Sequence, residues 1–213
     1  MTDRLIEIFN ALPKCDTFAD VGCDHGYIAK AMLDGKKCKK VIISDISQKC
    51  LDKATNLLSS YIKNGKAESV LSNGFQNIKF CDQALIAGMG GEEIISIIRD
   101  SKFLPKTLIL QPMKNVDKVR QFVVEKGYKI LTDYVFFAEE KYYDLLVLTI
   151  GKDCLTEDEI EFGRTNLIKR NKAFIDRLNL QIKTLEKISK KEDLSSQDRE
   201  RIKAKIERLK NYV

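Results

Sequence analysis

The first 150 residues alternate short apolar runs with longer stretches in which apolar residues recur every three or four positions. The short runs predict strands, and the longer stretches predict helices that connect parallel strands of one sheet. The predicted strands are residues 17–21, 40–44, 69–71, 83–87 and 107–111, and the predicted helices are residues 27–33, 48–63, 91–98 and 116–126. Gly127 ends the last of these helices. We therefore expect five strand–helix units in an open α/β sheet.

Two longer strands are predicted next, at residues 129–138 and 142–150, with only the polar residues 139–141 between them. A link this short cannot make a parallel crossover, so the two strands must pair as an antiparallel hairpin. The predicted sheet is Rossmann-like and mostly parallel, and it ends in one reversed strand.

Beyond Gly151 the strand pattern stops and a helical pattern takes over. Thr156 and Glu159 have the spacing of a capping box, which predicts a helix start near Glu157. A long helix is predicted over residues 171–189, and Ser195 with Asp198 predicts the start of a second one. Their apolar stripes are Phe174, Leu178, Ile182, Leu185 and Ile188 on the first helix, and Ile202, Ile206, Leu209 and Val213 on the second.

These two helices, joined by the link KKEDLSS, predict an antiparallel hairpin or coiled coil about 30 Å long. We call residues 171–213 the C-terminal arm. We predict two domains, a sheet domain over residues 1–151 and a helical domain over residues 152–213. Two interpretations of the arm stay open: it mediates dimerisation, or it binds RNA. We expect a monomer, because the two helices can bury their stripes on each other, although a dimer through the same surface is an alternative.

The composition agrees with a globular chain, since 213 residues with 44% hydrophobic and 32% charged side chains can bury a substantial core. No apolar run approaches the roughly 20 residues of a membrane-spanning helix, and the polar first residues lack the apolar stretch of a secretory signal. We therefore expect a cytoplasmic protein. Six cysteines without a C-x-x-C pair and a single histidine argue against a zinc site and a disulfide framework, so we expect reduced thiols in small apolar spaces and no metal.

The basic residues are unevenly distributed. The whole chain has 37 Lys and Arg against 31 Asp and Glu, a net charge of +6. Residues 1–151 hold 21 basic and 19 acidic residues, whereas residues 152–213 hold 16 and 12, so the shorter segment carries +4 of the excess. This concentration indicates either a polyanionic partner for the C-terminal segment or simply a solvated helical face.

The segment ADVGCDHGYIA, residues 19–29, joins the first predicted strand to the first predicted helix. Gly22 allows a sharp turn and the close approach of a ligand, and Gly26 keeps the helix start uncluttered. The G-x-x-x-G spacing does not meet the dinucleotide fingerprint G-x-G-x-x-G. Asp20 and Asp24 would repel a pyrophosphate, so the methionine end of S-adenosylmethionine, which has its own cation and only a carboxylate, suits the loop better.

The other strand ends carry further candidate groups. Asp45, in SDI at residues 44–46, can accept hydrogen bonds from both hydroxyls of a ribose, or it can serve only as a helix cap. Asn73 could bind an adenine edge, and the glycines of AGMGG, residues 87–91, leave room at the rim of the sheet. The fifth strand ends in LQP, residues 110–112. Ligands of open α/β sheets bind beyond the carboxyl ends of the strands, which is where all of these motifs fall.

With these motifs, the sequence resembles the bacterial tRNA (adenine-22-N1)-methyltransferases, which are class I S-adenosylmethionine-dependent enzymes with a helical C-terminal arm. The resemblance covers nearly the whole chain and includes ADVGCDHGYIA, SDI, SNG at residues 72–74, AGMGG, LQP and the strand KYYDLL from Lys141. The combination of DHGY, AGMGG and LQP is its specific part. Departures from the family pattern occur at Cys23, Gly26, Ala29 and Met113.

The resemblance implies methyl transfer from S-adenosylmethionine to N1 of adenine 22 in tRNA. It assigns cofactor binding to Asp20, Gly22, Cys23, Gly26, Asp45, Ile46, Asn73, Gly74, Ala87, Gly88, Met89 and Gly90. The candidates for catalysis are Asp24, His25 and Tyr27, where Tyr27 would stack on the flipped base and His25 is either a proton acceptor or a structural loop residue. The candidates for substrate binding are Gly91, Gln111 and Pro112 in the pocket and Lys190, Lys191, Arg199, Arg201, Lys203 and Lys205 on the arm.

Two other classes of function stay open at the level of the sequence. One is a class I methyltransferase that acts on a protein or small molecule, and the other is a non-catalytic nucleoside-binding module with an interaction arm. AGMGG has no side chain to accept a proton from an exocyclic amino group, unlike the D/N-P-P-Y/F tetrapeptide of amino-methyltransferases. This argues against methylation of an exocyclic amine.

Overall fold

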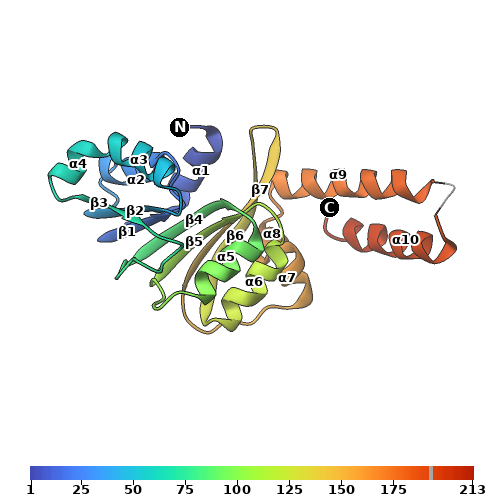
Figure 1. The fold of residues 1–213 in the computed structure, drawn as a ribbon. Coiled ribbons are helices and arrows are strands. Elements are labelled where there is room, and N and C mark those ends of the chain that lie inside the picture. The colour runs from blue at the N-terminus through green and yellow to red at the C-terminus, as the bar shows by residue number, and fades with distance from the viewer. Residues whose placement is uncertain (192–193) are drawn as a thin grey trace.

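The computed structural model describes residues 1–191 and 194–213, and within them seven strands form one sheet in the order β3-β2-β1-β4-β5-β7-β6 (Figure 1). The strands are β1 (Thr17–Val21), β2 (Lys40–Asp45), β3 (Ala67–Leu71), β4 (Gln83–Met89), β5 (Thr107–Pro112), β6 (Tyr128–Ala138) and β7 (Lys141–Ile150). Strands β1 to β5 pair in parallel, and β7 runs antiparallel to both β5 and β6. The predicted mostly parallel sheet with a terminal hairpin is confirmed.

Helices cover both faces of the sheet and continue beyond it (Figure 1). They are α1 (Asp3–Ala11), α2 (Tyr27–Asp34), α3 (Gln48–Leu57), α4 (Ser59–Lys63), α5 (Gly91–Arg99), α6 (Val116–Glu125), α7 (Glu157–Phe162), α8 (Arg164–Lys169), α9 (Lys172–Ser189) and α10 (Ser196–Lys210). The capping box of Thr156 and Glu159 is present at the start of α7, and Ser195 caps α10.

The structure differs from the predicted elements in four places. The helix predicted over residues 48–63 is two helices, because Leu58, fully buried with φ −100° and ψ 13°, interrupts it. No helix follows β3; residues 72–82 form a loop whose Phe75, Ile78 and Cys81 are buried, so only four of the five parallel strands lead into helices. The sequence prediction also missed α1 and α8.

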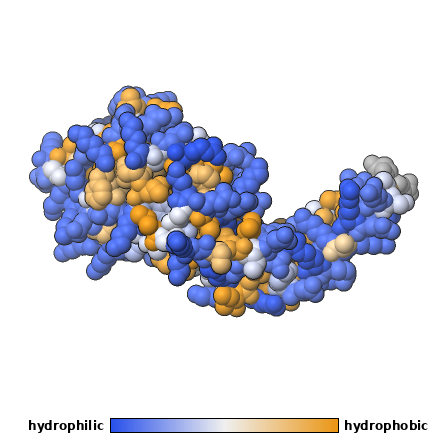
Figure 2. Space-filling view, turned by 90° about the horizontal axis from the view of Figure 1, so that it is seen from below, coloured by the Kyte–Doolittle hydropathy of each residue, from blue (hydrophilic) through white to orange (hydrophobic). Residues whose placement is uncertain are grey.

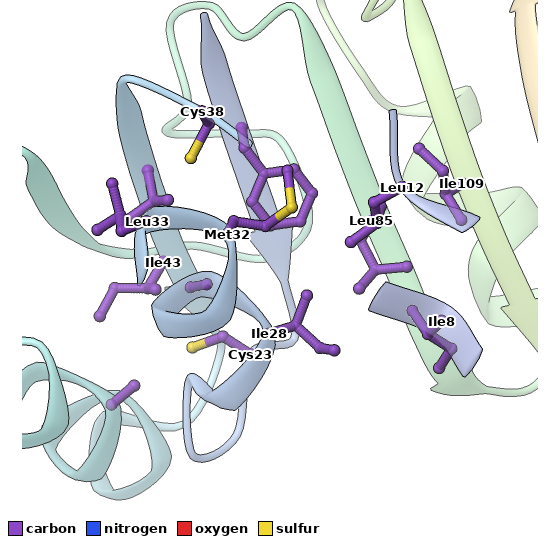
Figure 3. Packing of buried hydrophobic residues seen from close by; sticks show 14 of the residues in the cluster. Ile8, Leu12, Cys23, Ile28, Met32, Leu33, Cys38, Ile43, Leu85 and Ile109 are labelled. Atoms are coloured by element: carbon purple, nitrogen blue, oxygen red, sulfur yellow. The ribbon is translucent and has the colours of Figure 1, made fainter. Parts of the chain in front are cut away.

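The core lies on both faces of the sheet because the central strands are apolar on both sides, as expected for parallel strands between helices. One cluster joins α1 and α2 to the sheet, with Ile8 and Leu12 of α1 in the same buried group as Leu85 and Ile109 of the sheet (Figure 3). The second cluster lies under α5 and α6. The helix α1 is therefore part of the core.

The C-terminal arm projects from the sheet as a pair of helices, α9 and α10 (Figure 1). Phe174, Leu178 and Ile182 of α9 are buried together with Ile206 and Leu209 of α10, which confirms the predicted pairing of apolar stripes. Val213 is an exception, since it is 45% exposed and does not extend the stripe. Part of the predicted link KKEDLSS, residues 192–193, lies outside the described residues.

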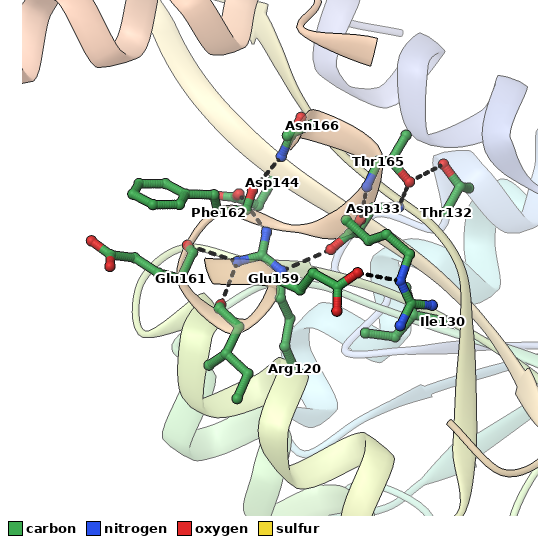
Figure 4. Close-up of polar contacts among 12 residues, drawn as sticks. Arg120, Ile130, Thr132, Asp133, Asp144, Glu159, Glu161, Phe162, Thr165 and Asn166 are labelled. Atoms are coloured by element: carbon green, nitrogen blue, oxygen red, sulfur yellow. Dashed lines mark hydrogen bonds and ion pairs between the residues drawn. The ribbon is translucent and has the colours of Figure 1, made fainter. Parts of the chain in front are cut away.

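A buried ionic network connects the helical segment to the sheet (Figure 4). Arg120 of α6 is fully buried, and its Nε donates to Asp133 Oδ2 at 2.9 Å while its Nη2 lies 3.3 Å from Asp144 Oδ1. Its Nη1 also donates to the carbonyls of Ile160 and Glu161, near the end of α7. The same residue thus contacts β6, β7 and α7, so it fastens the start of the helical segment to the hairpin.

The cysteines are free thiols in the described residues, and Cys23, Cys38 and Cys81 are buried. Burial raises the pKa of Cys38 to about 11, which keeps its thiol protonated and unreactive. Cys154 is exposed, contrary to the expectation that all six fill apolar spaces. The described part of the chain has no cluster of three or more His, Cys, Asp or Glu side chains arranged for a metal ion, and no helix there has the length and apolarity that a membrane span needs.

Candidate active site

A cleft of about 590 Å³ opens beyond the carboxyl ends of the parallel strands, within the usual size of a small-molecule site. Its walls come from α1, the loop after β1, the ends of β2, β3 and β4, and the tip of the β6–β7 hairpin. The predicted residues that line it are Asp20, Gly22, Cys23, Asp24, His25, Tyr27, Asp45, Ile46, Asn73, Gly74, Ala87, Gly88 and Met89.

The predicted residues Gly26, Gly90, Gly91, Gln111 and Pro112 lie outside the lining of the cleft. Gly26 and Gly90 are the N-caps of α2 and α5, and Gly91 is the buried first residue of α5. Gln111 and Pro112, at the end of β5, are buried. In the structure these residues support the walls of the cleft rather than form its surface.

Gly22 shapes the loop after β1. Its φ of +73° lies in the left-handed region, and a Cβ added there would stand 2.0 Å from Cε of Met89. The side chain of Met89 therefore occupies the space that a larger residue at position 22 would need. This contact packs the loop after β1 against the end of β4.

Asp20 is a buried acid at the floor of the cleft, only 6% exposed. Its Oδ2 accepts a hydrogen bond from the backbone N–H of Ala29 at 3.2 Å, in the first turn of α2. Burial raises the pKa of Asp20 to about 7; the N–H of Ala29 works against this shift, and the nearby Asp45 carboxylate adds to it. A cationic ligand group beside Asp20 would favour its ionised form.

Asp45 stands at the end of β2 and holds two loops together. Its Oδ2 accepts from the N–H of Asp24 at 3.2 Å, and its Oδ1 accepts from the N–H of Ser47 at 2.8 Å. Asp45 is not the N-cap of α3. The cap is Ser47, whose Oγ accepts from the N–H of Cys50 at the start of the helix. Each carboxylate oxygen has a further lone pair, so Asp45 can still accept bonds from a ligand's hydroxyls.

The three candidates for catalysis are neighbours at the mouth of the cleft. His25 Nδ1 lies 2.8 Å from Asp24 Oδ2, and the rings of His25 and Tyr27 are stacked, with centroids 5.5 Å apart and an interplanar angle of 2°. Tyr27 is 47% exposed, so much of its ring is accessible. Asp24 therefore faces Nδ1 of the imidazole, and the stacked Tyr27 ring lies on its other side.

The loop after β3 forms the side of the cleft where the sequence predicts an adenine. The buried Ser72 donates from Oγ to the carbonyl of Gly74 at 2.9 Å, and the same Oγ accepts from the N–H of Asn77. These bonds hold the turn around Asn73, which is itself exposed at the cleft. An amide on a fixed turn can bind a base edge with little loss of loop entropy.

Sequence reasoning missed the contribution of α1, whose Thr2, Arg4 and Leu5 line the cleft. The helix begins at Asp3, after its N-cap Thr2, and it lies against the sheet through Ile8 and Leu12. The signal was available in the sequence: Leu5, Ile8, Phe9 and Leu12 have the i, i+3, i+4, i+7 spacing of an amphipathic helix, and a threonine precedes them.

The six predicted substrate-binding cations lie on the C-terminal arm, and none of them lines the cleft. Lys190 and Lys191 follow α9, and the other four are Arg199, Arg201, Lys203 and Lys205 on α10. All are exposed except Arg199, which is half-buried and donates from Nη2 to the carbonyl of Lys191 at 3.0 Å. In Figure 2 the visible face of the arm is mostly hydrophilic.

The strand order with one reversed strand and the cleft beyond β1, β2 and β4 define a class I methyltransferase fold. The sequence profile of the family described as "Methyltransferase domain" matches residues 1–146, more than half of the chain. The chain therefore belongs to this family of methyltransferases.

Particular relatives extend the comparison, and two of the three below cover nearly the whole chain, including the arm. A Mycoplasma pneumoniae protein that is provisionally named a tRNA methyltransferase is 31% identical over 76% of this chain and 79% of its own length. The tRNA (adenine(22)-N(1))-methyltransferase of Bacillus subtilis is 23% identical over 98% of this chain and 94% of its own length. Among solved structures, M. capricolum TrmK in complex with S-adenosyl-homocysteine has a TM-score of 0.88 and 26% identity, covering 100% of this chain and 97% of that chain.

Proposed function

We propose that the chain transfers a methyl group from S-adenosylmethionine to N1 of adenine 22 in tRNA. The observation that carries the proposal is the likeness to M. capricolum TrmK, which extends over both the sheet and the arm at 26% identity. The B. subtilis relative named for this reaction aligns with nearly the whole chain as well. A general small-molecule methyltransferase would not need the arm.

The residues of the cleft fit S-adenosylmethionine, which would supply an electrophilic methyl group on a sulfonium. Asp45 offers acceptors for the ribose hydroxyls, and Asn73, at the next strand end, would bind the adenine. Gly22, which has no Cβ to collide with Met89, lets the loop after β1 lie close to the end of β4 at the wall of the cleft. Asp20 and Asp24 would face the positive charges of the sulfonium and the amino group.

The residues at the mouth of the cleft would serve the target base. N1 of an unpaired adenine has a free lone pair at neutral pH, so no strong base is required, and catalysis can depend on positioning and electrostatics. The exposed ring of Tyr27, backed by His25, provides a stacking surface for a flipped base. Methylation at N1 makes the ring cationic, and the Asp24 carboxylate, which contacts His25 beside Tyr27, would stabilise it.

The remaining assignments concern the whole chain. Residues 152–213 would form the tRNA-contacting domain and residues 1–151 the catalytic domain. The protein would act in the cytoplasm. It would be a monomer, because α9 and α10 bury their apolar stripes on each other and need no second copy to do so.

The direct test incubates the purified protein with methyl-labelled S-adenosylmethionine and a bulk tRNA pool, and then maps any 1-methyladenine by position. We expect label at position 22, and none in a tRNA transcript whose adenine 22 is replaced by guanine. Label transferred to protein or to another base would assign a different substrate, and cofactor binding without transfer to any tRNA would refute the proposal.

A further inference from the structure

The tip of the β6–β7 hairpin carries an exposed aromatic pair that lies outside the lining of the cleft. Phe137 of β6 is 56% exposed, and Tyr142, its partner on β7, is half-buried. The centroids of the two rings lie 4.9 Å apart, and the ring planes form an angle of 55°. We call Phe137 and Tyr142 the hairpin pair. Its accessible aromatic surface is of the kind on which proteins stack nucleobases.

The turn beside the hairpin pair has an unusual backbone. Ala138 pairs with Lys141, so only Glu139 and Glu140 form the turn. Both have positive φ values, 49° and 62°, as in a type I′ turn, where glycine and asparagine are the usual residues. Two glutamates in this conformation cost some backbone strain, which persists only where the surrounding structure fixes the chain. The short turn keeps the two rings of the hairpin pair directly opposite each other.

Packing on both faces holds the hairpin in place. On one face the buried Tyr143 belongs to the core cluster that includes α1. Arg4 of α1 donates from Nε to Oε1 of Gln111 at 2.9 Å, and its Cζ lies 5.5 Å from the centre of the Tyr143 ring. On the other face Tyr142 packs against the cluster that contains Phe174 of α9, and Figure 1 shows the hairpin beside the start of that helix. The hairpin pair is thus fixed before any ligand binds, which lowers the entropy cost of binding.

The hairpin pair stands at the rim of the cleft. Because β7 is antiparallel to both of its neighbours, β6 runs in the same direction as the parallel strands, and the hairpin tip lies at the edge of the sheet where the cleft opens. Glu139 of the turn lines the cleft, and Phe137 precedes it by only two residues, which span roughly 7 Å in a strand. An RNA strand with one base in the cleft would therefore pass the hairpin pair with an adjoining nucleotide.

The junction between α8 and α9 brings positive charge to the same place. Asn171 donates from Nδ2 to the carbonyl of Val135 at 3.0 Å, so the junction lies along the end of β6, close to Phe137. Cations at such positions suit the phosphates on either side of a stacked nucleotide. The exposed cations are Lys169, Arg170 and Lys172 at the junction and Lys141 after the turn.

Acids near the hairpin pair offset these cations only in part. Lys172 pairs with Asp176 at 2.6 Å, and the turn itself holds two glutamates. Lys141, Lys169 and Arg170 form no ion pair with an acid among residues 1–191 and 194–213. These three side chains can therefore contact phosphates.

We propose that the hairpin pair stacks on the nucleotide next to the target adenine of the tRNA, and that the cations around it contact the phosphates of that nucleotide. The proposal rests on tRNA as the substrate. A base that is flipped into the cleft leaves its neighbour without a stacking partner, and the hairpin pair would replace that partner. The aromatic faces and the cations together fit an RNA strand better than an apolar protein surface, which would not use the cations.

Filter binding with a tRNA transcript that has adenine at position 22 tests the proposal. Phe137→Ala should weaken binding roughly 5- to 100-fold, because stacking on an aromatic ring is lost, and should leave the salt dependence unchanged, because no charge is removed. Phe137→Trp should bind as tightly as the wild type, whereas Phe137→Leu should lose nearly as much as the alanine variant. The matched control is Phe80→Ala, which removes a 61% exposed phenylalanine from the loop after β3, outside the lining of the cleft, and should change nothing.

Transcripts with an abasic site on either side of adenine 22 identify the nucleotide. Removing the base on one side, but not on the other, should weaken binding by the wild type and abolish the difference between the wild type and Phe137→Ala. The affinity of each variant for S-adenosyl-homocysteine, measured by calorimetry, should not change, because the hairpin pair lies outside the lining of the cleft.

Unchanged tRNA affinity in Phe137→Ala would overturn the proposal, and so would full affinity in Phe137→Leu or an equal loss in Phe80→Ala. A difference that persists with both abasic transcripts, or a wild-type dimer that Phe137→Ala dissociates, would assign the hairpin pair to another contact and overturn it as well. The test needs binding but no methyl transfer. Tight tRNA binding without transfer would refute only the proposed reaction, whereas transfer to position 22 with unchanged affinity in Phe137→Ala would refute only the role of the hairpin pair.

Discussion

Single side chains of the cleft combine a structural and a ligand-binding task, and Asp45 is the clearest case. Its two oxygens hold the N–H groups of Asp24 and Ser47 and still have lone pairs for a ribose. The carboxylate thus fixes the loops on either side of the position where the nucleoside would bind. Its removal should affect the ligand more than the fold, because Asp45 is only half-buried.

Asp45→Ala should reduce the affinity for S-adenosyl-homocysteine by roughly 100-fold or more, because hydrogen bonds to a charged group contribute about 1.5–3 kcal/mol each. Calorimetry measures the affinity, and circular dichroism checks that the fold survives. Asp52→Ala is the control, since Asp52 is an exposed acid on α3 that bonds only to Gln48. Retained affinity in Asp45→Ala would remove Asp45 from the ribose role.

Asp20 predicts a pH dependence of stability. Its pKa is about 7 in the folded protein against an ordinary value of 3.8, so the folded state holds a proton that the unfolded state releases between these values. The free energy of unfolding of the protein without ligand should therefore fall as the pH rises from about 4 to about 7, by up to about 1.4 kcal/mol per pH unit, and then level off.

Asp20→Asn keeps the shape of the side chain and removes the titration. In denaturant unfolding between pH 4.5 and 8, the variant should gain stability relative to the wild type as the pH rises, with the difference constant above about pH 7. All other ionisable groups are the same in the two proteins, so their effects largely cancel in the difference. A difference that does not change with pH would contradict the raised pKa of Asp20.

At the scale of secondary-structure elements, the network around Arg120 decides how the helical segment is attached. Asp133 of β6 and Asp144 of β7 share this guanidinium, and Arg177 of α9 adds a second contact to Asp144 at 2.7 Å. The carbonyls near the end of α7 accept hydrogen bonds from the remaining nitrogen of Arg120, Nη1 (Figure 4). Four elements and the start of the arm therefore depend on one buried side chain.

Arg120→Met should destabilise the protein by about 3–5 kcal/mol, because two buried carboxylates would lose their shared partner. Chemical denaturation measures the loss. Arg201→Met is the matched control. Its side chain is 71% exposed, its one ion pair within the described residues is with Asp198 at 3.7 Å, and its loss should change stability by less than about 1 kcal/mol. Similar stabilities for the two variants would show that the network does not hold these elements together.

At the scale of the whole molecule, the basic arm projects from the sheet (Figure 1), and none of its described residues lines the cleft. This arrangement suits a substrate large enough to contact both. From residue 171 to residue 211 the arm holds 12 basic and 7 acidic residues. Several of its acids are engaged, as Asp176 pairs with Lys172 and Glu207 with Lys210. Lys190, Lys191, Lys203 and Lys205 are exposed and form no ion pair with an acid among residues 1–191 and 194–213, so they can contact phosphates.

Replacing Lys190, Lys191, Lys203 and Lys205 together with Ala should weaken tRNA binding at least 10-fold and reduce the slope of log K against log salt by about one for each lost phosphate contact. Filter binding at several salt concentrations measures both. The affinity for S-adenosyl-homocysteine should not change. The matched control replaces four exposed lysines that precede strands β3, β4 and β5, namely Lys66, Lys79, Lys102 and Lys106. Equal effects of the two quadruple variants would refute a specific role for the arm.

Much of this architecture follows from the sequence alone, because the underlying signals are local. Alternation and helical spacing identified the seven strands and most helices, and the turn between residues 139 and 141 was too short for anything but a hairpin. The residue types at the ends of β1 to β4 identified most of the cleft lining, since the carboxyl ends of parallel strands meet at one edge. The helix caps at Thr156 and Ser195 could be predicted because each depends only on residues that are neighbours in the sequence.

Only the tertiary structure placed Arg4 in the cleft, buried Arg120 between two carboxylates and interrupted a predicted helix at Leu58. Arg4 and its partner Gln111 are 107 positions apart, and no local pattern relates them. The conformation and partners of such residues depend on which surfaces pack together. Sequence periodicity shows which face of an element is apolar. Which surface covers that face depends on the packing of the whole core.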